Sequence, residues 1–190
     1  PSGVAAVEEM GKFAAVILTG DIRFTLQLVK NIKEYVKLGG TVVVNSGHAK
    51  AFDKAFLGLE VEKSSFTSQN MKVAAVKLNT ARPIFTDEKA RPLITKNNYG
   101  KGSVIFTAPY FMLENNKKSR SPLITKLLKK IQSEVMPFQV SGDVQFLVNK
   151  MDKDNWKLIL MNNRGVSKPP LSSFQKIHHE FDSKVTVTVP

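Results

Sequence analysis

Polar residues that could do chemistry follow two apolar runs near the start of the chain. Asp21 ends "AAVILTGD", and Asn45, Ser46 and His48 end "TVVVNSGH". A serine nucleophile needs a base within hydrogen-bond reach and a third group that orients the base. The spacing allows Ser46 and His48 to approach, but "SGH" is not the G-x-S-x-G elbow of serine hydrolases. We interpret it as a polar turn, with two alternatives: a degenerate ligand site of these four residues at the carboxyl edge of a sheet, and a hydrolase with an unrecognised site.

Two further motifs lack the spacing of known ligand sites. A phosphate loop requires G-x-x-x-x-G-K-[ST] before a helix, whereas Gly100-Lys101-Gly102 precedes an apolar strand pattern and predicts a tight hairpin turn. His178 and Glu180 could share one face of a strand, but His179 would face the other way. Zinc needs further ligands, and the nearest other histidine, His48, is far away in the sequence. We predict no metal site and no cofactor.

Paired carboxylates, which glycosidic cleavage requires, are not evident in the pattern. Asp21 ends a predicted strand, Asp53 and Glu60 flank a predicted short helix, and Asp87 and Glu88 lie in a predicted turn. Each position suits a cap or a solvent-facing charge. We therefore predict no catalytic residue in this chain.

Basic side chains gather around a predicted helix in the second half of the chain. The cluster comprises Lys117, Lys118, Arg120, Lys126, Lys129 and Lys130. Such a cluster can hold phosphate or sulfate groups through salt-sensitive contacts. Few aromatic residues interleave it, which argues against a stacking platform for single-stranded nucleic acid. We interpret it as a solvated surface, with polyanion contact as the alternative.

Composition narrows the classes of function. The chain has 190 residues, 42% of them hydrophobic, and a formal net charge of +12 at pH 7. The absence of cysteine excludes thiol catalysis, disulfides and thiolate metal sites. No stretch resembles a signal peptide, and none is apolar over the length that a membrane span needs. Because the chain begins at Pro1 and ends in the strand pattern "KVTVTVP", we expect it to be part of a longer polypeptide.

The apolar pattern predicts a strand, a helix and a strand in succession. "FAAVILTGD" is a continuous apolar run, typical of a strand inside a sheet. Helical spacing then relates Leu26, Val29, Ile32 and Val36. Asp21 or Thr25 can cap this helix, and Gly39-Gly40 ends it. The β-branched run at 41–45 is the second strand, so the unit indicates parallel strands.

Further elements follow along the chain. We predict a short helix within residues 48–60, a loop at 62–70, strands at 71–79, 91–97 and 104–108, and a surface helix at 122–135. From about residue 138, strict alternation predicts an antiparallel β domain. Trp156, the one tryptophan, alternates with Leu158 and Leu160, so we place it in a core rather than on a sugar-binding surface.

Several motifs together resemble a known arrangement. They are "VILTGDIRFTLQLVKNIKEYVKLGGTVVVNSG", "YGKGSVIFTAPYFML", the helix at 122–135 and "WKLILMNNRG". Over about residues 13 to 165, this combination resembles the glutamine-amidotransferase-like domain and small β domain that follow the catalytic barrel in bacterial glycoside hydrolases, including the β-galactosidase trimerisation domain. A true class I amidotransferase carries a cysteine on a strand-to-helix elbow, so the missing cysteine excludes that reaction.

The resemblance implies an α/β fold, with a flavodoxin-like, class I amidotransferase-like, mostly parallel sheet and flanking helices at 1–136 and a partial antiparallel, sandwich-like domain at 137–190. It also implies a non-catalytic accessory or assembly region of a bacterial glycoside-hydrolase-like protein that acts on carbohydrate. A glycan- or polyanion-binding module is the alternative. The implied partners are the preceding catalytic domain of the same chain, a homo-oligomer and a polysaccharide, rather than nucleic acid or a membrane. An extracytoplasmic location, periplasmic or secreted, follows from the resemblance alone.

Overall fold

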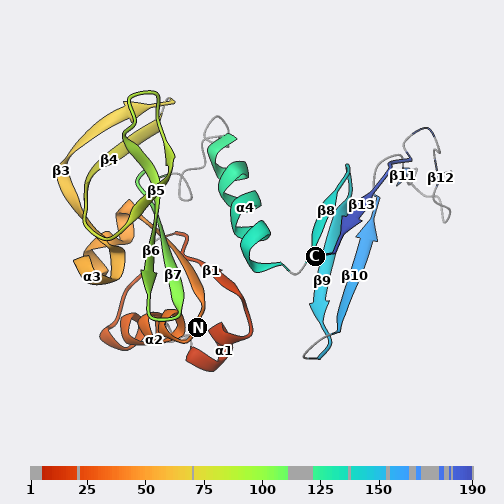
Figure 1. Cartoon of the computed structure of the whole chain (residues 1–190), viewed down its shortest axis with the longest axis horizontal. Coiled ribbons are helices and arrows are strands. Elements are labelled where there is room, and N and C mark those ends of the chain that lie inside the picture. The colour runs from red at the N-terminus through yellow and green to blue at the C-terminus, as the bar shows by residue number, and fades with distance from the viewer. Residues whose placement is uncertain are drawn as a thin grey trace. The chain divides into compact units, whose positions relative to one another are not determined.

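The computed structural model describes residues 6–20, 22–69, 71–110, 122–136, 138–152, 155–162, 166–167, 176–177, 180 and 182–189. The chain divides into two compact units, Pro1–Ile131 and Gln132–Pro190 (Figure 1). The domain limits expected from the sequence, 1–136 and 137–190, stay a prediction. Within the described ranges, every helix is too short or too polar to cross a bilayer.

A five-stranded sheet forms the centre of the first unit (Figure 1). In spatial order its strands are β1 (Ala15–Ile17), β2 (Thr41–Asn45), β7 (Gly102–Thr107), β6 (Pro92–Tyr99) and β5 (Arg82–Thr86). β1, β2 and β7 are parallel, and β6 runs antiparallel to both β7 and β5. Four strands therefore share one direction, and the expected α/β fold with a mostly parallel sheet is confirmed at this level.

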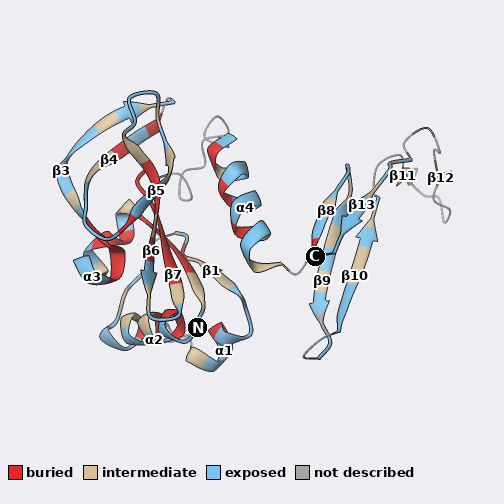
Figure 2. Cartoon of the chain, viewed as in Figure 1, coloured by how far each residue is buried: buried red, intermediate tan, exposed pale blue. Residues whose placement is uncertain are grey.

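The core lies on the inner strands (Figure 2). Every residue at 42–44 of β2 and at 104–106 of β7 is buried, so both faces of these strands are covered. Continuous apolar runs are the pattern that such strands require. β1 differs from the expectation of an inner strand: it lies at the sheet edge and is only half-buried, because β2 is its one partner among the described strands.

Four α-helices and one 3-10 helix accompany the strands in the described part of the chain. They are α1 (Val7–Gly11), α2 (Leu26–Lys37), η1 (Ser46–Ala51), α3 (Lys54–Leu57) and α4 (Pro122–Val135). Of the two expected caps of α2, Thr25 is the one observed, since its Oγ1 accepts a hydrogen bond from the Leu28 amide at 3.1 Å. Asp21 lies outside the described residues. Helix α4 forms as predicted and buries Leu123, Leu127 and Ile131.

The Gly100–Gly102 segment is the hairpin turn that its sequence predicts. It joins β6 to β7, with Tyr99 paired to Gly102, and Gly100 has a φ of 63° that favours glycine. The Lys101 amide donates a hydrogen bond to the Lys37 carbonyl at 3.0 Å. Because the last carbonyls of a helix lack partners within it, this turn caps the end of α2.

Two glycines near the end of α2, Gly40 and Gly102, occupy positions where a side chain would clash. A Cβ on Gly102 would lie 2.2 Å from the Gly40 carbonyl oxygen and 2.3 Å from that of Val36. A Cβ on Gly40 would lie 2.2 Å from the ring of Tyr35. We call this contact between Gly39-Gly40 and Gly100–Gly102 the glycine junction. It accounts for the glycines at positions 40 and 102, where a side chain would not fit.

A long hairpin of β3 (Leu59–Ser68) and β4 (Met71–Leu78) forms a separate two-stranded sheet. The loop expected at 62–70 is therefore wrong as far as Ser68, because backbone pairing with β4 holds a polar, exposed sequence in a strand. The register shifts between Val61 and Ser65, which marks a β-bulge. The Ala74 amide donates to the Ala108 carbonyl at 3.1 Å, so β4 contacts the segment that follows β7.

The second unit contains three two-stranded antiparallel sheets in its described part. They pair β8 (Gln139–Ser141) with β13 (Thr186–Thr188), β9 (Gln145–Lys150) with β10 (Trp156–Met161), and β11 (Val166–Ser167) with β12 (Lys176–Ile177). The expected antiparallel pairing is confirmed. A sandwich is not, since each described sheet has only two strands.

Trp156 does not occupy the core position expected for it. Its side chain is 40% exposed, and Leu160 on the same strand is exposed as well. Alternation along a strand decides which residues share a face, but a second layer is needed to bury that face. The periodic pattern therefore predicted the strand correctly and its burial wrongly.

Asn97 ties strand β6 to helix α3 and to the turn before β5. Its Nδ2 donates to the Ala55 carbonyl at 3.0 Å and to the Phe56 carbonyl at 2.8 Å. Its Oδ1 accepts from Thr80 Oγ1 at 2.8 Å. The side chain is buried, so water cannot replace these bonds without a rearrangement.

Replacing Asn97 with leucine removes all three hydrogen bonds and leaves buried acceptors without a donor. We expect the free energy of unfolding, measured by urea denaturation, to fall by about 2 to 4 kcal/mol. Asn98→Leu is the matched control, because Asn98 is the exposed neighbour on the same strand and should change stability by no more than about 0.5 kcal/mol. Equal losses in the two variants would contradict this role for Asn97.

Asp53 caps α3 and pairs with α2. Its Oδ1 accepts from the Phe56 amide at 2.8 Å, and its Oδ2 accepts from Lys33 Nζ. The hydrogen bond from Lys33 is the main cause that holds the pKa of the Asp53 carboxyl below its usual value. The lowered pKa means that the folded state favours the ionised carboxylate.

The Asp53→Asn substitution keeps the capping oxygen and removes the charge. A carboxyl whose pKa is lowered by folding stabilises the protein above its unfolded pKa of about 4, and that contribution is lost as the pH falls through the lowered value. At pH 7 we expect a loss of at most about 1 kcal/mol, because the carboxylate is half exposed. Thermal unfolding of both proteins should converge in acid, whereas a difference that persists there would rule out the charge as its cause.

Candidate functional site

The carboxyl ends of β2 and β7 lie side by side, which brings the predicted site residues to one edge of the sheet. Asn45 at the end of β2 pairs with Thr107 at the end of β7. Asn45 is only 1% exposed, and its Oδ1 accepts from the Gly47 amide at 2.9 Å. This bond caps η1, so the expected polar turn is a short 3-10 helix held by the asparagine.

His48 joins η1 to the segment that follows β1. Its Nε2 lies 2.8 Å from the Gly20 carbonyl oxygen. Because a carbonyl only accepts, we assign the hydrogen to Nε2. The ring is 5% exposed and meets Phe24 edge to face, with centroids 5.3 Å apart. Its Nδ1 is buried and has no partner among the described residues.

Asn45, Ser46 and His48 are thus brought together, but not as a nucleophile and its base. No hydrogen bond joins the Ser46 hydroxyl to either described ring nitrogen of His48, and Nε2 is occupied by Gly20. Asp21, the fourth residue of the predicted ligand site, lies outside the described residues. The ligand site therefore stays a prediction, with its three described members at the expected edge of the sheet.

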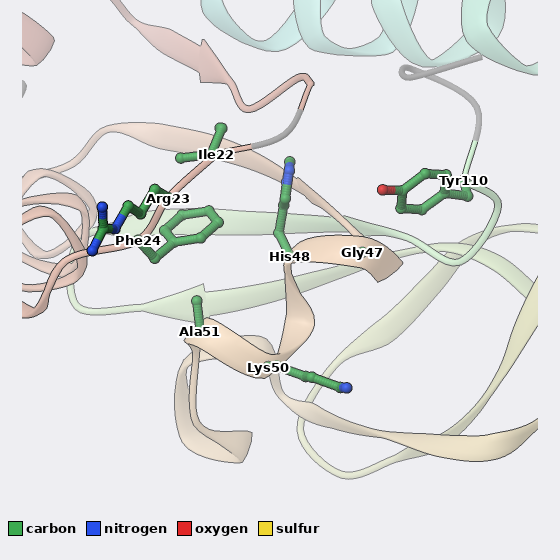
Figure 3. Close-up of a pocket in the computed structure, with 8 residues that line it drawn as sticks. All are labelled: Ile22, Arg23, Phe24, Gly47, His48, Lys50, Ala51 and Tyr110. Atoms are coloured by element: carbon green, nitrogen blue, oxygen red, sulfur yellow. The ribbon is translucent and has the colours of Figure 1, made fainter. Parts of the chain in front are cut away.

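A pocket of about 500 Å³ opens beside His48 (Figure 3). We call it the carboxyl-end pocket. Arg23 and Phe24 line it from the connection between β1 and α2, Lys50 from η1, and Tyr110 from the segment after β7. These four residues were missed in the sequence. The available signal was the position of Tyr110, an aromatic residue directly beyond the carboxyl end of a buried strand.

Tyr110 packs on Gly47 and separates this pocket from a second one. A Cβ on Gly47 would lie 1.9 Å from Tyr110 Cε2, so the ring rests against the bare backbone. The second pocket, of about 440 Å³, shares Gly47 and Tyr110 and is lined by Lys63 and Lys72 of the β3–β4 hairpin. We call it the hairpin pocket. Tyr110 is 36% exposed and lines both pockets.

The other predicted sites remain outside this region. Lys126, Lys129 and Lys130 lie on the exposed side of α4, while Lys117, Lys118 and Arg120 fall outside the described residues. Polyanion contact therefore stays a prediction. His178 and His179 also fall outside the described residues. Within the ranges that the structure covers, no group of three potential metal ligands comes together.

Comparison with known proteins finds similarity only among solved structures. No protein-family model and no curated protein matches the chain. The β-galactosidase from Bacillus circulans sp. alkalophilus matches with a TM-score of 0.54 and 15% identity, over 84% of this chain and 28% of that chain. Cytoplasmic Protein STM3548 from Salmonella typhimurium matches with a TM-score of 0.50 and 14% identity, over 67% of this chain and 74% of that one.

A third match is the exo-β-1,4-mannosidase Op5Man5 from Opitutaceae bacterium strain TAV5, with a TM-score of 0.46 and 15% identity over 70% of this chain. The chain spans 25% of the mannosidase and 28% of the β-galactosidase. Identities this low show a likeness of fold alone. At that level, the resemblance that the motifs predict, to the amidotransferase-like trimerisation region of β-galactosidases, is confirmed.

A methyl group at position 47 should push the Tyr110 ring away from the backbone on which it packs. Because the ring is partly exposed and can swing away, we expect Gly47→Ala to lower the free energy of unfolding by about 1 kcal/mol. In a Tyr110→Ala background the clash is absent, so the same change should cost nothing measurable. A double-mutant cycle in urea tests this coupling. An equal loss in both backgrounds would show that Gly47 serves the backbone rather than the ring.

Proposed function

We propose that this chain is a non-catalytic accessory region of a bacterial glycoside-hydrolase-like protein, which supports assembly or positioning of a separate catalytic domain. One observation carries the proposal. The fold matches the Bacillus circulans β-galactosidase over 84% of this chain but only 28% of that chain, as a supporting part of a larger glycosidase would. A flavodoxin-like, amidotransferase-like ancestry of the sheet belongs to the same proposal.

The chemistry of the described residues supports an accessory role. Acyl transfer by serine requires a hydroxyl bonded to its base, whereas Ser46 and His48 are not bonded to each other. Asp53 and Asp87, two of the carboxylates considered for glycoside cleavage, are engaged by Lys33 and Arg91. Asp53 also caps a helix, so its geometry serves the fold.

Exposed apolar side chains give the assembly part of the proposal a place on the first unit. Phe13 precedes β1 and Leu38 follows α2, and both are largely exposed. The Phe13 carbonyl accepts from Tyr35 on α2, so the two segments meet at the amino end of the sheet. Association through this end would leave the pockets at the carboxyl end open. The extracytoplasmic location rests on the resemblance alone, and the matched STM3548 is described as cytoplasmic.

Sedimentation velocity over a range of concentrations tests assembly directly. We expect the chain to self-associate, and the double variant Phe13→Glu, Leu38→Glu to weaken association by about tenfold, because it places two charges in the contact. Leu26→Glu is the matched control, since Leu26 is an exposed leucine at the opposite end of α2. A chain that is monomeric at every concentration would contradict the assembly role.

Turnover measurements test the non-catalytic part. With chromogenic aryl glycosides and aryl esters as substrates, we expect no hydrolysis above background from the purified chain. Hydrolysis that Ser46→Ala or His48→Ala abolishes would overturn the accessory role and support a hydrolase instead. Circular dichroism melting of both variants would show whether a loss reflects chemistry or unfolding, because His48 also bonds Gly20.

A further inference from the structure

The carboxyl-end pocket has the position and size of a small-molecule site. It opens where β2 and β7 end, and open α/β sheets bind ligands outside the carboxyl ends of their strands. Its volume of about 500 Å³ lies within the range of pockets that enclose small ligands. Figure 3 shows the residues around it, with Phe24 and Tyr110 on different sides of His48.

The charges at this pocket favour an anion. Arg23 and Lys50 line it, and neither forms an ion pair with a described residue. No described lining residue is acidic. The adjoining hairpin pocket adds Lys63 and Lys72 against the single carboxylate of Glu62. A cleft lined by cations with few carboxylates raises the local concentration of anions.

Buried polar atoms without partners lie at the ends of β2 and β7, and one of them, His48 Nδ1, belongs to a residue that lines the pocket. Four such side-chain atoms occur among the described residues, and three of them belong to Asn45, His48 and Thr107 at the ends of β2 and β7. An unsatisfied buried polar group costs about 1 to 3 kcal/mol, so a position that only fills space would be better served by an apolar side chain. Of these three residues, His48 is the one that lines the pocket, and a polar group in a largely apolar wall is typical of a binding site.

The remaining walls are flat and apolar. Tyr110 is held against Gly47, and Phe24 is held edge to face by Phe52, with centroids 5.4 Å apart. The contact with Phe52 therefore positions Phe24 before any ligand arrives, whereas the partly exposed Tyr110 rests on Gly47 and can still move. We propose that the carboxyl-end pocket binds a small organic anion, a ring that carries one carboxylate or phosphate group, which the positive charges of Arg23 and Lys50 attract and which packs with its ring against Tyr110.

Isothermal titration of the full chain tests the proposal with defined probes. The probes are glucuronate, glucose 6-phosphate, benzoate, glucose and inorganic phosphate. At least one ring anion should bind saturably at millimolar concentration or below, at least about tenfold more tightly than glucose or inorganic phosphate. The ranking of carboxylate against phosphate, and of sugar against aromatic ring, then identifies the ligand class. Added salt should weaken binding, because the contacting charges are solvent-exposed.

Variants locate the site and keep the test decisive. Arg23→Gln, Lys50→Gln and Tyr110→Ala should each weaken binding of the best probe by about tenfold. Lys30→Gln removes the same charge from the exposed face of α2, outside the pocket, and should leave binding unchanged. Absence of saturable binding for all three ring anions would overturn the proposal, as would equal binding of glucose or an equal loss in Lys30→Gln. None of these results bears on self-association, so the accessory role stands or falls separately.

Discussion

The glycine junction is the constraint on which the first unit depends. Neither Gly40 nor Gly102 could carry a side chain, because a Cβ on Gly102 would meet the backbone of Val36 and Gly40, and a Cβ on Gly40 would meet the ring of Tyr35. This contact holds the hairpin turn against the end of α2 and brings Thr41 opposite Ser103, whose hydroxyl oxygens lie 3.1 Å apart. The pairing register of β2 and β7 does not shift along their short ladder. The contact at the start of the two strands therefore determines which residues pair at their ends.

What meets there is a set of buried polar groups that the described residues satisfy only in part. Asn45 and Thr107 are opposite each other at the far end of the same ladder, and His48 follows directly. The structure uses one atom of each ring or amide for its own scaffold, through Gly47 and Gly20, and leaves the other atom uncommitted. One edge of this sheet is fixed by close packing, and the other edge carries polar groups that are only partly hydrogen-bonded. Such an arrangement lets α/β folds bind different ligands while their sheets stay the same.

Sequence patterns predicted the elements whose signals are local. The strand at 41–45, a cap of α2 at Asp21 or Thr25 and the turn at Gly100–Gly102 were each predicted, because β-branched runs, capping side chains and glycines act on their own neighbours. Contacts between residues far apart in the sequence could not be predicted from these patterns. Strand β3 is polar and takes its conformation from β4, and the exposure of Trp156 depends on layers that no short window contains. Nothing in the sequence distinguishes Arg23 and Lys50 from other surface cations, because only the fold brings both to one pocket.

The bulge in β3 has a consequence for solubility. A two-stranded hairpin offers free backbone donors and acceptors along its outer edge, which another chain could extend into a continuous ladder. The register shift between Val61 and Ser65 interrupts that row, and the interrupted stretch carries the charges of Glu62 and Lys63. The shift therefore disfavours continuous backbone pairing between the hairpins of two molecules. The β3–β4 hairpin can thus line a pocket while its interrupted edge disfavours pairing with another chain.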